Sequence, residues 1–312
     1  MKVLSINNLS INEDLACSVG NFDGFHKGHL KILNTLKDIA KEKNLKTAVI
    51  TFDPHPRQVL QKKSLCKILN FETKKEFLTK IGIDYLIVIP FNKKIANLTK
   101  EDFLKLLKEN LKCNIVVVGK DWRFGKNREG DINFAKEFGK KLQLEVIAME
   151  EEKIKDKKIS SSLIRELLRE GKIKQVNKVL GRNYCLKGKV VEGKKLGRKI
   201  GFPTINLKVG ENLCLKEGVY VGFIEIKDKI YNAIMNFGKR PTVDGKETVL
   251  EVHILNENFN ENLKSGYLKT YFIDYLREEK KFNSLQELKR QIEKDVEKAK
   301  NILKEVKNEV LV

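Results

Sequence analysis

The sequence has few cysteines, and they are not arranged as in a cross-linked or zinc-binding protein. The five cysteines lie far apart, and no two of them form a Cys-x-x-Cys pair. An odd, scattered set argues against a disulfide framework and against a zinc site. We therefore expect buried thiols in a protein of the reducing cytosol.

Long apolar runs are absent as well. No stretch approaches the ~20 consecutive apolar residues that a membrane-spanning helix needs. The N-terminal segment MKVLSINNLSINED lacks an apolar signal region and has two acidic residues where that region would lie. The expectation is a cytoplasmic protein without a membrane partner.

Negative charge is scarce relative to positive charge, because 62 Lys and Arg stand against 42 Asp and Glu, a net charge of +20. Such an excess favours polyanions such as nucleic acid or anionic lipid. Lysine makes up most of the basic residues, however, and it is spread along the whole chain rather than gathered in an arginine-rich patch. We expect solvated lysine faces that assist the capture of phosphorylated substrates, and no nucleic-acid partner.

The sequence does contain two kinds of apolar pattern, and 312 residues suit two domains. In the first part the apolar runs are rich in Val and Ile and nearly continuous, as in strands buried on both faces of a parallel sheet. Segments with helical periodicity separate them, which predicts a doubly wound α/β domain with ligands at the carboxyl ends of its strands. The expected strands are 15–20, 47–52, 85–91, 114–119 and 144–149.

In the second part the apolar runs alternate more clearly and follow one another through short turns, without intervening helices. This pattern predicts an antiparallel barrel or sandwich. The chain then closes with a long helix, for which Ser284 and Glu287 form a capping box. We place the boundary near Arg182, which gives an α/β domain at 1–182 and an antiparallel β domain with a terminal helix at 183–312.

The most informative motif follows the first predicted strand and opens a helix, where residues 20–29 read GNFDGFHKGH. Its glycines permit a tight turn and close approach to a phosphate, and a helix N-terminus attracts anions. His26 and His29 can point to the same side of this turn and stabilise charge at the α-phosphorus of a triphosphate. One histidine here would suit a helix cap, whereas the pair favours a function. The candidate ATP-binding residues are Gly20, Asn21, Phe22, Asp23, Gly24 and Gly28.

This motif carries a family resemblance. HKGH fits the HxGH signature of the nucleotidylyltransferase superfamily, and the whole segment resembles the FMN adenylyltransferase module of bacterial FAD synthetases. TFDPHP at 51–56 resembles that module's second-strand loop, which helps to cover the flavin, and GKDWRFG at 119–125 is similar to its fourth-strand segment. By this resemblance the flavin-binding residues are Asp53, Pro54, His55 and Asp121.

A second anion clamp is predicted at residues 159–165, ISSSLIR, which resemble the SSTxIR motif of the same module. A serine run opens a helix there, and Arg165 lies one turn in, on the face of Ser161 and Ser162. Hydroxyls, helix N–H groups and an arginine would hold a leaving pyrophosphate, and an ordinary N-cap with a surface arginine is the alternative. Ser162 replaces the family's usual threonine and keeps the hydroxyl. The implied reaction is attack of the FMN phosphate on the α-phosphorus of ATP, with Mg²⁺ on the phosphates.

The second part contains a basic, glycine-containing segment, GKVVEGKKLGRKIGFPTINL at 188–207. It suits a loop that folds over nucleotide phosphates through backbone N–H groups, although it is not a Walker motif and could be a plain basic turn before a strand. Thr204 and Asn206 offer oxygens on one face of an extended segment, which suits Mg²⁺. The candidate ATP-binding residues are Gly193, Lys194, Gly197, Arg198 and Gly201.

The same segment matches the GRxxGFPTxN signature of riboflavin kinases. The resemblance implies that Thr204 and Asn206 bind metal and phosphate, that Glu251 takes the proton of the ribityl 5′-hydroxyl, and that Arg277 binds flavin. A carboxylate acts as a base only within hydrogen-bond reach, and a glutamate on an exposed strand face is the alternative. Asn256 stands where the family has Asp-Phe, a departure in the turn and not at the base. Further matching segments lie at 218–220, 236–243 and 251–255.

Nearly the whole chain thus resembles the bifunctional riboflavin kinase/FAD synthetases, which implies riboflavin, FMN and ATP as substrates and Mg²⁺ as the metal. Three other readings stay open. One module could be inactive, the charge could serve nucleic-acid binding, or the chain could be a cytidylyltransferase, which would explain HKGH but not the second domain. A monomer or weak homo-oligomer is expected.

Overall fold

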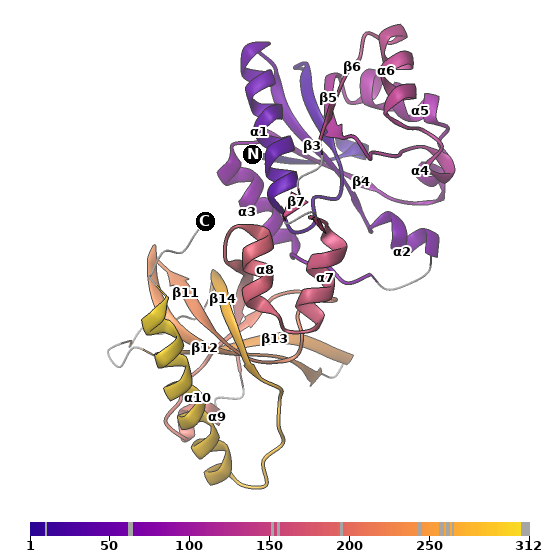
Figure 1. Ribbon diagram of the computed structural model, residues 1–312. Coiled ribbons are helices and arrows are strands. Elements are labelled where there is room, and N and C mark those ends of the chain that lie inside the picture. Colours follow the sequence, from indigo (N-terminus) through magenta and orange to yellow (C-terminus); the bar gives the residue numbers. More distant parts are fainter. Residues whose placement is uncertain are drawn as a thin grey trace. The chain divides into compact units, whose positions relative to one another are not determined.

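The computed structural model describes residues 1–9, 11–61, 65–150, 153–154, 157–193, 196–242, 245–255, 259, 263 and 265–306. The chain divides into two compact units, each of which is described by itself (Figure 1). Unit 1 comprises Met1–Leu65 and Lys74–Ser160, and unit 2 comprises Cys66–Thr73 and Ser161–Val312.

Unit 1 is built on a six-stranded sheet in the order β1-β4-β3-β2-β5-β6, in which all neighbouring strands are parallel. All the predicted apolar runs form strands of this sheet, which confirms the doubly wound α/β prediction. The runs are nearly continuous because the central strands are covered on both faces, and every residue of β2 is buried. The strands are β1 (Lys2–Ser5), β2 (Leu15–Val19), β3 (Lys46–Asp53), β4 (Tyr85–Pro90), β5 (Cys113–Gly119) and β6 (Glu145–Met149).

The strand order reverses at β2. From β2 the chain continues through β3 to β4 on one side, and it later returns to β5 and β6 on the other side. The carboxyl ends of the adjacent strands β2 and β5 form the kind of switch point at which open α/β sheets bind ligands. The loop that starts at Gly20 follows β2, and the loop that starts at Lys120 follows β5. Two predicted binding loops therefore lie at this switch point.

Helices connect the parallel strands of unit 1, as parallel pairing requires. The helix α1 (Lys27–Glu42) buries Leu33, Leu36 and Ala40. Within the described ranges, no helix combines the length and the apolar character needed to cross a bilayer. The other elements up to Ser160 are η1 (Ile6–Asn8), α2 (Pro56–Gln61), α3 (Phe71–Ile81), α4 (Lys93–Ala96), α5 (Lys100–Lys105), η2 (Leu106–Asn110), η3 (Lys126–Arg128), α6 (Ile132–Lys141), β7 (Lys153–Ile154) and β8 (Lys157–Lys158).

Unit 2 contains a closed barrel in the order β10-β13-β12-β11-β14-β9, with antiparallel pairing throughout. Of the two predicted antiparallel forms, the structure shows the barrel. The strands are β9 (Tyr184–Val191), β10 (Ile205–Lys208), β11 (Gly218–Ile226), β12 (Lys229–Thr242), β13 (Gly245–Ile254) and β14 (Tyr267–Arg277). The helices are α7 (Ser161–Arg169), α8 (Ile173–Leu180), α9 (Leu196–Lys199) and α10 (Leu285–Glu305).

The terminal helix α10 begins at the predicted capping residues. Ser284 Oγ accepts a hydrogen bond from the Glu287 N–H at 3.1 Å, and Glu287 Oε2 accepts one from the Asn283 N–H at 3.0 Å. These bonds satisfy N–H groups that have no partner inside the helix. The helix buries Asp295, Ala299 and Leu303.

The contact division after Ser160 lies well before the expected boundary near Arg182. The helices α7 and α8 group with the barrel, and Asn177 of α8 shows one reason. Its Nδ2 donates to the Phe272 carbonyl oxygen of β14 at 2.8 Å, and its Oδ1 accepts from the Tyr184 N–H of β9 at 2.7 Å. One asparagine thus ties α8 to two barrel strands.

The expectation of unpaired thiols is wrong for four of the five cysteines. Cys17 is bonded to Cys113, and Cys66 is bonded to Cys214. The partners are 96 and 148 residues apart in the sequence, so spacing along the chain could not reveal them. Cys17 and Cys113 become neighbours only because β2 and β5 pair in the folded sheet. Cys185 is buried and forms no disulfide, as expected.

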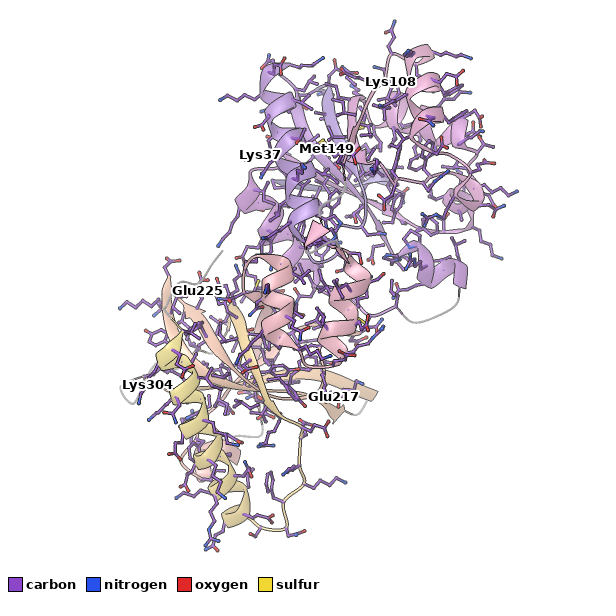
Figure 2. All side chains as sticks on the ribbon, in the orientation of Figure 1. Lys37, Lys108, Met149, Glu217, Glu225 and Lys304 are labelled. Carbon is purple, nitrogen blue, oxygen red and sulfur yellow. A yellow bond between two sulfur atoms is a disulfide. The ribbon has the colours of Figure 1, made fainter. Side chains whose placement is uncertain are left out.

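Lysine side chains belong to both units. Figure 2 labels Lys37 of α1, Lys108 of η2 and Lys304 of α10 among all the side chains drawn. The first two belong to unit 1 and the third to unit 2. The basic residues are therefore carried by both units rather than by one of them.

Candidate active sites

The loop between β2 and α1 is a tight turn held by buried aromatic rings. Phe22 and Phe25 are 3% and 0% exposed, and both have left-handed φ angles, of 45° and 44°. Gly24 between them has a φ of 100°, which glycine adopts without steric cost. Left-handed backbone is unfavourable for a residue as bulky as phenylalanine, and such strain gathers at functional sites. The buried rings hold this backbone in place immediately before the predicted histidine pair.

The two predicted catalytic histidines are stacked on each other. The ring centroids of His26 and His29 are 3.7 Å apart, with 19° between the ring planes, which confirms that the rings share one side of the turn. His26 is 8% exposed and is the N-cap of α1, because its Nδ1 accepts from the His29 N–H at 3.4 Å. Phe22 lies 5.1 Å from the His29 ring. The capping role and the paired arrangement therefore coexist at His26.

The predicted flavin loop after β3 contacts the predicted ATP loop after β2. Asn21 Nδ2 lies 3.0 Å from His55 Nε2. Lys74 Nζ donates to the Asn21 carbonyl oxygen at 2.8 Å and brings a cation to the same loop. Sequence reasoning missed Lys74, because it lies in a helical segment without a motif. Asp53 and Pro54, which precede His55, are exposed.

The loop after β5 presents Asp121 at the same edge of the sheet. The Trp122 N–H donates to the Gly119 carbonyl oxygen at 2.9 Å, which makes a tight turn around Asp121. Phe124 and Gly130 exchange two backbone hydrogen bonds, of 3.1 and 2.9 Å, that close the rest of the loop. The stacked rings of Trp122 and Phe124, 4.2 Å apart, brace it further. Asp121 itself is exposed on this braced loop.

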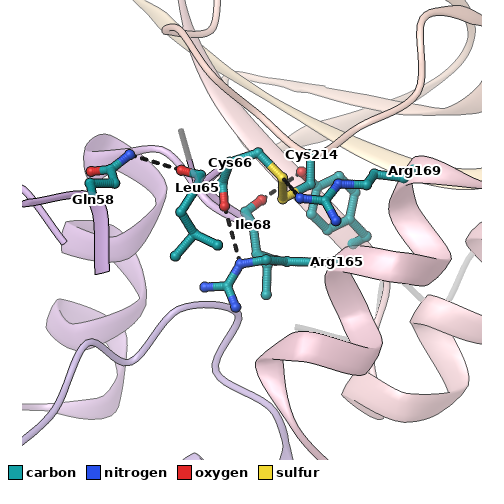
Figure 3. The surroundings of a disulfide bond; sticks show 8 residues. Gln58, Leu65, Cys66, Ile68, Arg165, Arg169 and Cys214 are labelled. Atoms are coloured by element: carbon teal, nitrogen blue, oxygen red, sulfur yellow. Dashed lines mark hydrogen bonds between the residues drawn. A yellow bond between two sulfur atoms is a disulfide. The ribbon is translucent and has the colours of Figure 1, made fainter. Parts of the chain in front are cut away.

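Arg165 of α7 is buried, which rules out the surface arginine of the alternative reading. It is 5% exposed, and its Nε donates to the Cys66 carbonyl oxygen at 3.1 Å (Figure 3). Ser161 is the first residue of α7, and Ser162 is exposed. The contact division assigns α7 to unit 2 and the histidine pair to unit 1, so their joint action on one ATP stays a prediction.

In unit 2 the predicted metal ligand and the predicted base are direct cross-strand neighbours. Asn206 of β10 lies opposite Glu251 of β13, and directly opposed residues share one face of a sheet. Asn206 is 6% exposed, and its buried Oδ1 has no hydrogen-bond partner among the described residues. On the other side of Glu251 lies Asn236 of β12. We call Asn206, Glu251 and Asn236 the polar row.

Two glycines of the predicted phosphate loop have steric reasons to be glycine. A β-carbon on Gly193 would lie 2.6 Å from Cγ of Asn206, well inside van der Waals contact. A β-carbon on Gly197 would overlap the carbonyl oxygen of Phe202. The Phe202 N–H donates to the Gly197 carbonyl oxygen at 2.8 Å and so closes the turn before β10. These two glycines therefore pack against the segment that carries the predicted metal ligands.

No contact that would position a phosphate is described for the remaining predicted phosphate-binding residues of this loop. Arg198 is exposed, and Gly201 is exposed with a φ of 90°. Lys194 lies outside the described residues, as does Asn256.

The segment that carries Thr204 is fixed by a histidine. His253 Nδ1 lies 2.8 Å from the Pro203 carbonyl oxygen, and this nitrogen carries the proton because a carbonyl only accepts. The Phe202 ring packs edge-on against His253, with centroids 5.3 Å apart. Burial lowers the pKa of His253 by more than the bond to Pro203 raises it. A neutral imidazole on the strand of Glu251 thus holds the residue before Thr204.

The donors around Asn206 fit Mg²⁺. The buried Asn206 Oδ1 and the hydroxyl of half-buried Thr204 are hard oxygen ligands of the kind that this ion takes. Within the described residues, no group of three or more His, Cys, Asp or Glu side chains could hold a metal ion. An ion at Asn206 would therefore complete its shell with substrate phosphates and water.

Arg277, the predicted flavin ligand at the end of β14, is anchored to the terminal helix. Its Nε and one η-nitrogen donate to Asp295 Oδ2 at 2.8 and 2.7 Å. The other η-nitrogen donates to the Glu278 carbonyl oxygen at 2.9 Å. Because the Asp295 side chain is only 2% exposed, this ion pair is largely withdrawn from water. The contacts give Arg277 a structural role, and its contact with flavin stays a prediction.

Two family models match the chain, one in each part. Residues 8–163 match the model for FAD synthetase, and residues 180–303 match the model for riboflavin kinase. The first match contains the histidine pair, and the second contains the polar row. The segment between the two matches holds most of α7 and α8.

Relatives match the chain over nearly its full length. A bifunctional riboflavin kinase/FMN adenylyltransferase of Buchnera aphidicola is 38% identical over 95% of this chain and 97% of its own, and one of Bacillus subtilis is 36% identical over 93% of each. A solved structure described as a macrolide-efflux protein from Streptococcus pneumoniae is 30% identical, with a TM-score of 0.80 over 96% of this chain and 99% of its own. With both modules matched and relatives this similar from end to end, the chain belongs to the bifunctional riboflavin kinase/FMN adenylyltransferase family.

Proposed function

We propose that this chain phosphorylates riboflavin to FMN in its barrel and adenylylates FMN to FAD with the loops of its parallel sheet. The observation that carries the proposal is the presence of two separate constellations. The stacked histidine pair lies at the switch point of unit 1, the polar row lies in the barrel of unit 2, and each falls within its own family match. Two reactions in sequence need two such sites.

In the kinase reaction, Glu251 takes the proton from the ribityl 5′-hydroxyl as its oxygen bonds to the γ-phosphorus of ATP and the bond to ADP breaks. Thr204 and Asn206 would hold Mg²⁺, which would supply positive charge to offset that of the transferring phosphoryl group. The role of Asn206 is supported by its buried and unpartnered Oδ1 beside Glu251, among the described residues. The ATP phosphates lie under the loop of Gly193, Lys194, Gly197, Arg198 and Gly201.

In the adenylyl transfer, a phosphate oxygen of FMN attacks the α-phosphorus of ATP, and pyrophosphate leaves. His26 and His29 stabilise the charge that develops there, at the start of α1. Ser161, Ser162 and Arg165 hold the pyrophosphate. The loop residues that contact ATP are Gly20, Asn21, Phe22, Asp23, Gly24 and Gly28, and those that contact the flavin are Asp53, Pro54, His55 and Asp121.

The test is a time course with the purified chain, riboflavin and Mg-ATP, with FMN and FAD resolved by chromatography. FMN should rise first and FAD should follow, and supplied FMN with ATP should give FAD and pyrophosphate directly. If FMN forms from riboflavin but supplied FMN is never adenylylated, only the kinase half survives. If neither product forms from folded protein, the assignment fails.

We also propose that the protein works in the cytoplasm as a monomer or weak homo-oligomer and has no nucleic-acid partner. Lysines on both units supply a diffuse positive field that suits phosphorylated small molecules. Light scattering across a concentration series tests the oligomeric state. A steep salt dependence of binding to duplex DNA would contradict the last part.

A further inference from the structure

We propose that Asn236 is a substrate-binding residue of the kinase reaction, and that its carboxamide oxygen accepts a hydrogen bond from a secondary hydroxyl of the ribityl chain. The inference rests on the proposed kinase function and adds to it a residue that sets specificity for the alcohol. It starts from the polar row, in which Asn236 and Asn206 lie opposite Glu251 on either side.

The orientation of the Asn236 amide follows from its contact with Glu279. Asn236 Nδ2 donates to Glu279 Oε1 at 2.9 Å. An ionised carboxylate can only accept, so the amide nitrogen must face Glu279 and the amide oxygen must face away from it. That oxygen is buried and has no hydrogen-bond partner within the described part of the chain.

Gly238 makes this orientation possible. It lies two residues beyond Asn236 on β12, and alternate residues of a strand share a face. A β-carbon on Gly238 would lie 3.0 Å from the carboxyl carbon of Glu279 and would overlap one of its oxygens. The bare glycine therefore lets the carboxylate rest on β12 within reach of Asn236.

The order of the residues in the polar row indicates the direction in which the ribityl chain of riboflavin extends from Glu251. Asn206 and Asn236 are each one strand spacing, about 4.8 Å, from Glu251, on opposite sides. In the proposed kinase reaction the phosphoryl group arrives from the side of Asn206, the residue that would hold the metal, and the reacting hydroxyl lies at Glu251. The remainder of the alcohol then extends toward Asn236.

A hydroxyl suits Asn236 Oδ1 better than a metal ion does. Oxygens that share one Mg²⁺ at about 2.1 Å lie within roughly 4.2 Å of each other. Asn236 and Asn206 are two strand spacings apart, roughly 10 Å, and the amide of Asn236 is tied to Glu279. A buried acceptor without a partner is unfavourable, and a polyol supplies the donor that it lacks. The ribityl chain carries secondary hydroxyls next to the one that is phosphorylated.

The test compares two alcohols in the full-length chain. The first is riboflavin, and the second is an isoalloxazine whose N10 carries a 5-hydroxypentyl chain, with the same primary hydroxyl but no secondary ones. The kcat/KM for phosphorylation of each is measured for the unaltered protein, for Asn236→Leu and for Asn232→Leu. Asn232 is an exposed asparagine four residues away on the same strand and serves as the matched control.

We expect the unaltered protein and Asn232→Leu to prefer riboflavin over the hydroxypentyl analogue. Asn236→Leu should lose roughly 5- to 10-fold of that preference, the value of one neutral hydrogen bond, through a higher KM for riboflavin with the KM for ATP unchanged. An unaltered preference in Asn236→Leu overturns the inference while leaving riboflavin kinase activity itself established. If the unaltered protein phosphorylates neither alcohol, the proposed function fails instead.

A second variant covers the case in which Asn236→Leu does not fold. Glu279→Gln changes an exposed side chain and gives Asn236 a partner that both donates and accepts, so the amide is no longer held one way. The preference for riboflavin should then fall in the same direction by a smaller factor. A Glu279→Gln protein with the full preference contradicts the orientation and the inference with it.

Discussion

Gly193 and Asn206 are packed so closely that no side chain fits between them. The loop glycine lies directly against the buried carboxamide, and a β-carbon there would come within 2.6 Å of the amide carbon. Asn206 cannot withdraw freely, because it is 6% exposed and its strand is paired on both sides. Gly193 of the phosphate loop and Asn206, the metal ligand of the proposed kinase site, are therefore in direct contact.

Gly193→Ala should displace the Asn206 carboxamide and depress FMN formation from riboflavin. A displacement of about 1 Å in a catalytic group can cost on the order of 100-fold in rate. Initial rates of FMN formation measure the effect, and FAD formation from supplied FMN by the same preparation serves as the control. A normal FMN rate would show that the position of Asn206 does not limit the reaction.

His29→Ala should depress FAD formation by on the order of 100-fold and leave FMN formation largely intact, because one preorganised donor to a developing charge is lost. Equal damage to both reactions would indicate a folding defect.

His26→Asn complements this variant, because asparagine is one of the preferred N-cap residues but has no imidazole ring. Loss of FAD formation in His26→Asn, at unchanged melting temperature, would separate the function of His26 from its role as the cap of α1.

Much of the fold was predictable because the burial of a strand determines the pattern of apolar residues along it. The nearly continuous apolar runs of β2 to β6 indicate strands that are buried on both faces. The alternating runs of the barrel indicate strands with one buried face. The histidine pair was predictable for a similar reason, since residues three apart at a helix start share a side. Each of these features depends on positions that are close in sequence.

The features that were missed depend on which strands become neighbours. The bond of Cys17 to Cys113 needs β2 beside β5, and the place of Asn236 in the polar row needs the register of β12 against β13. The grouping of α7 and α8 with the barrel likewise depends on contacts such as those that Asn177 makes with strands later in the chain. Local periodicity indicates where strands form but not which distant strands become neighbours.

The cysteine pairings predict a thiol count. Unfolded without reductant, the chain should show one reactive thiol, that of Cys185, and after reduction it should show five. Cys185→Ser should lower the first count to zero and serves as the control. Reduction should also lower the free energy of unfolding, by roughly 2–4 kcal/mol for each bond. Five thiols in the unreduced chain would show that neither pair is bonded in solution.

Asp295→Ala should destabilise the barrel unit, because it leaves the Arg277 guanidinium without its counter-charge in a largely buried position. Breaking such a pair typically costs about 3–5 kcal/mol in the free energy of unfolding. Denaturant titration measures the loss, and Glu293→Ala, an exposed carboxylate on the same helix, should change stability by less than about 0.5 kcal/mol. Equal effects of the two variants would contradict the anchoring role of Arg277.

Glu251→Gln gives the most direct test of the kinase mechanism, because it keeps the size of the side chain and removes its capacity to take a proton. FMN formation should fall by roughly 100- to 10,000-fold, the contribution of a positioned general base. Riboflavin and Mg-ATP should still bind, since Thr204, Asn206 and the loop of Gly193 are untouched, and riboflavin fluorescence measures that binding. FAD formation from supplied FMN should continue at its normal rate and so provides an internal control. A Glu251→Gln enzyme that makes FMN at an undiminished rate would mean that another group or water accepts the proton, and that Glu251 is only the cross-strand neighbour of Asn206.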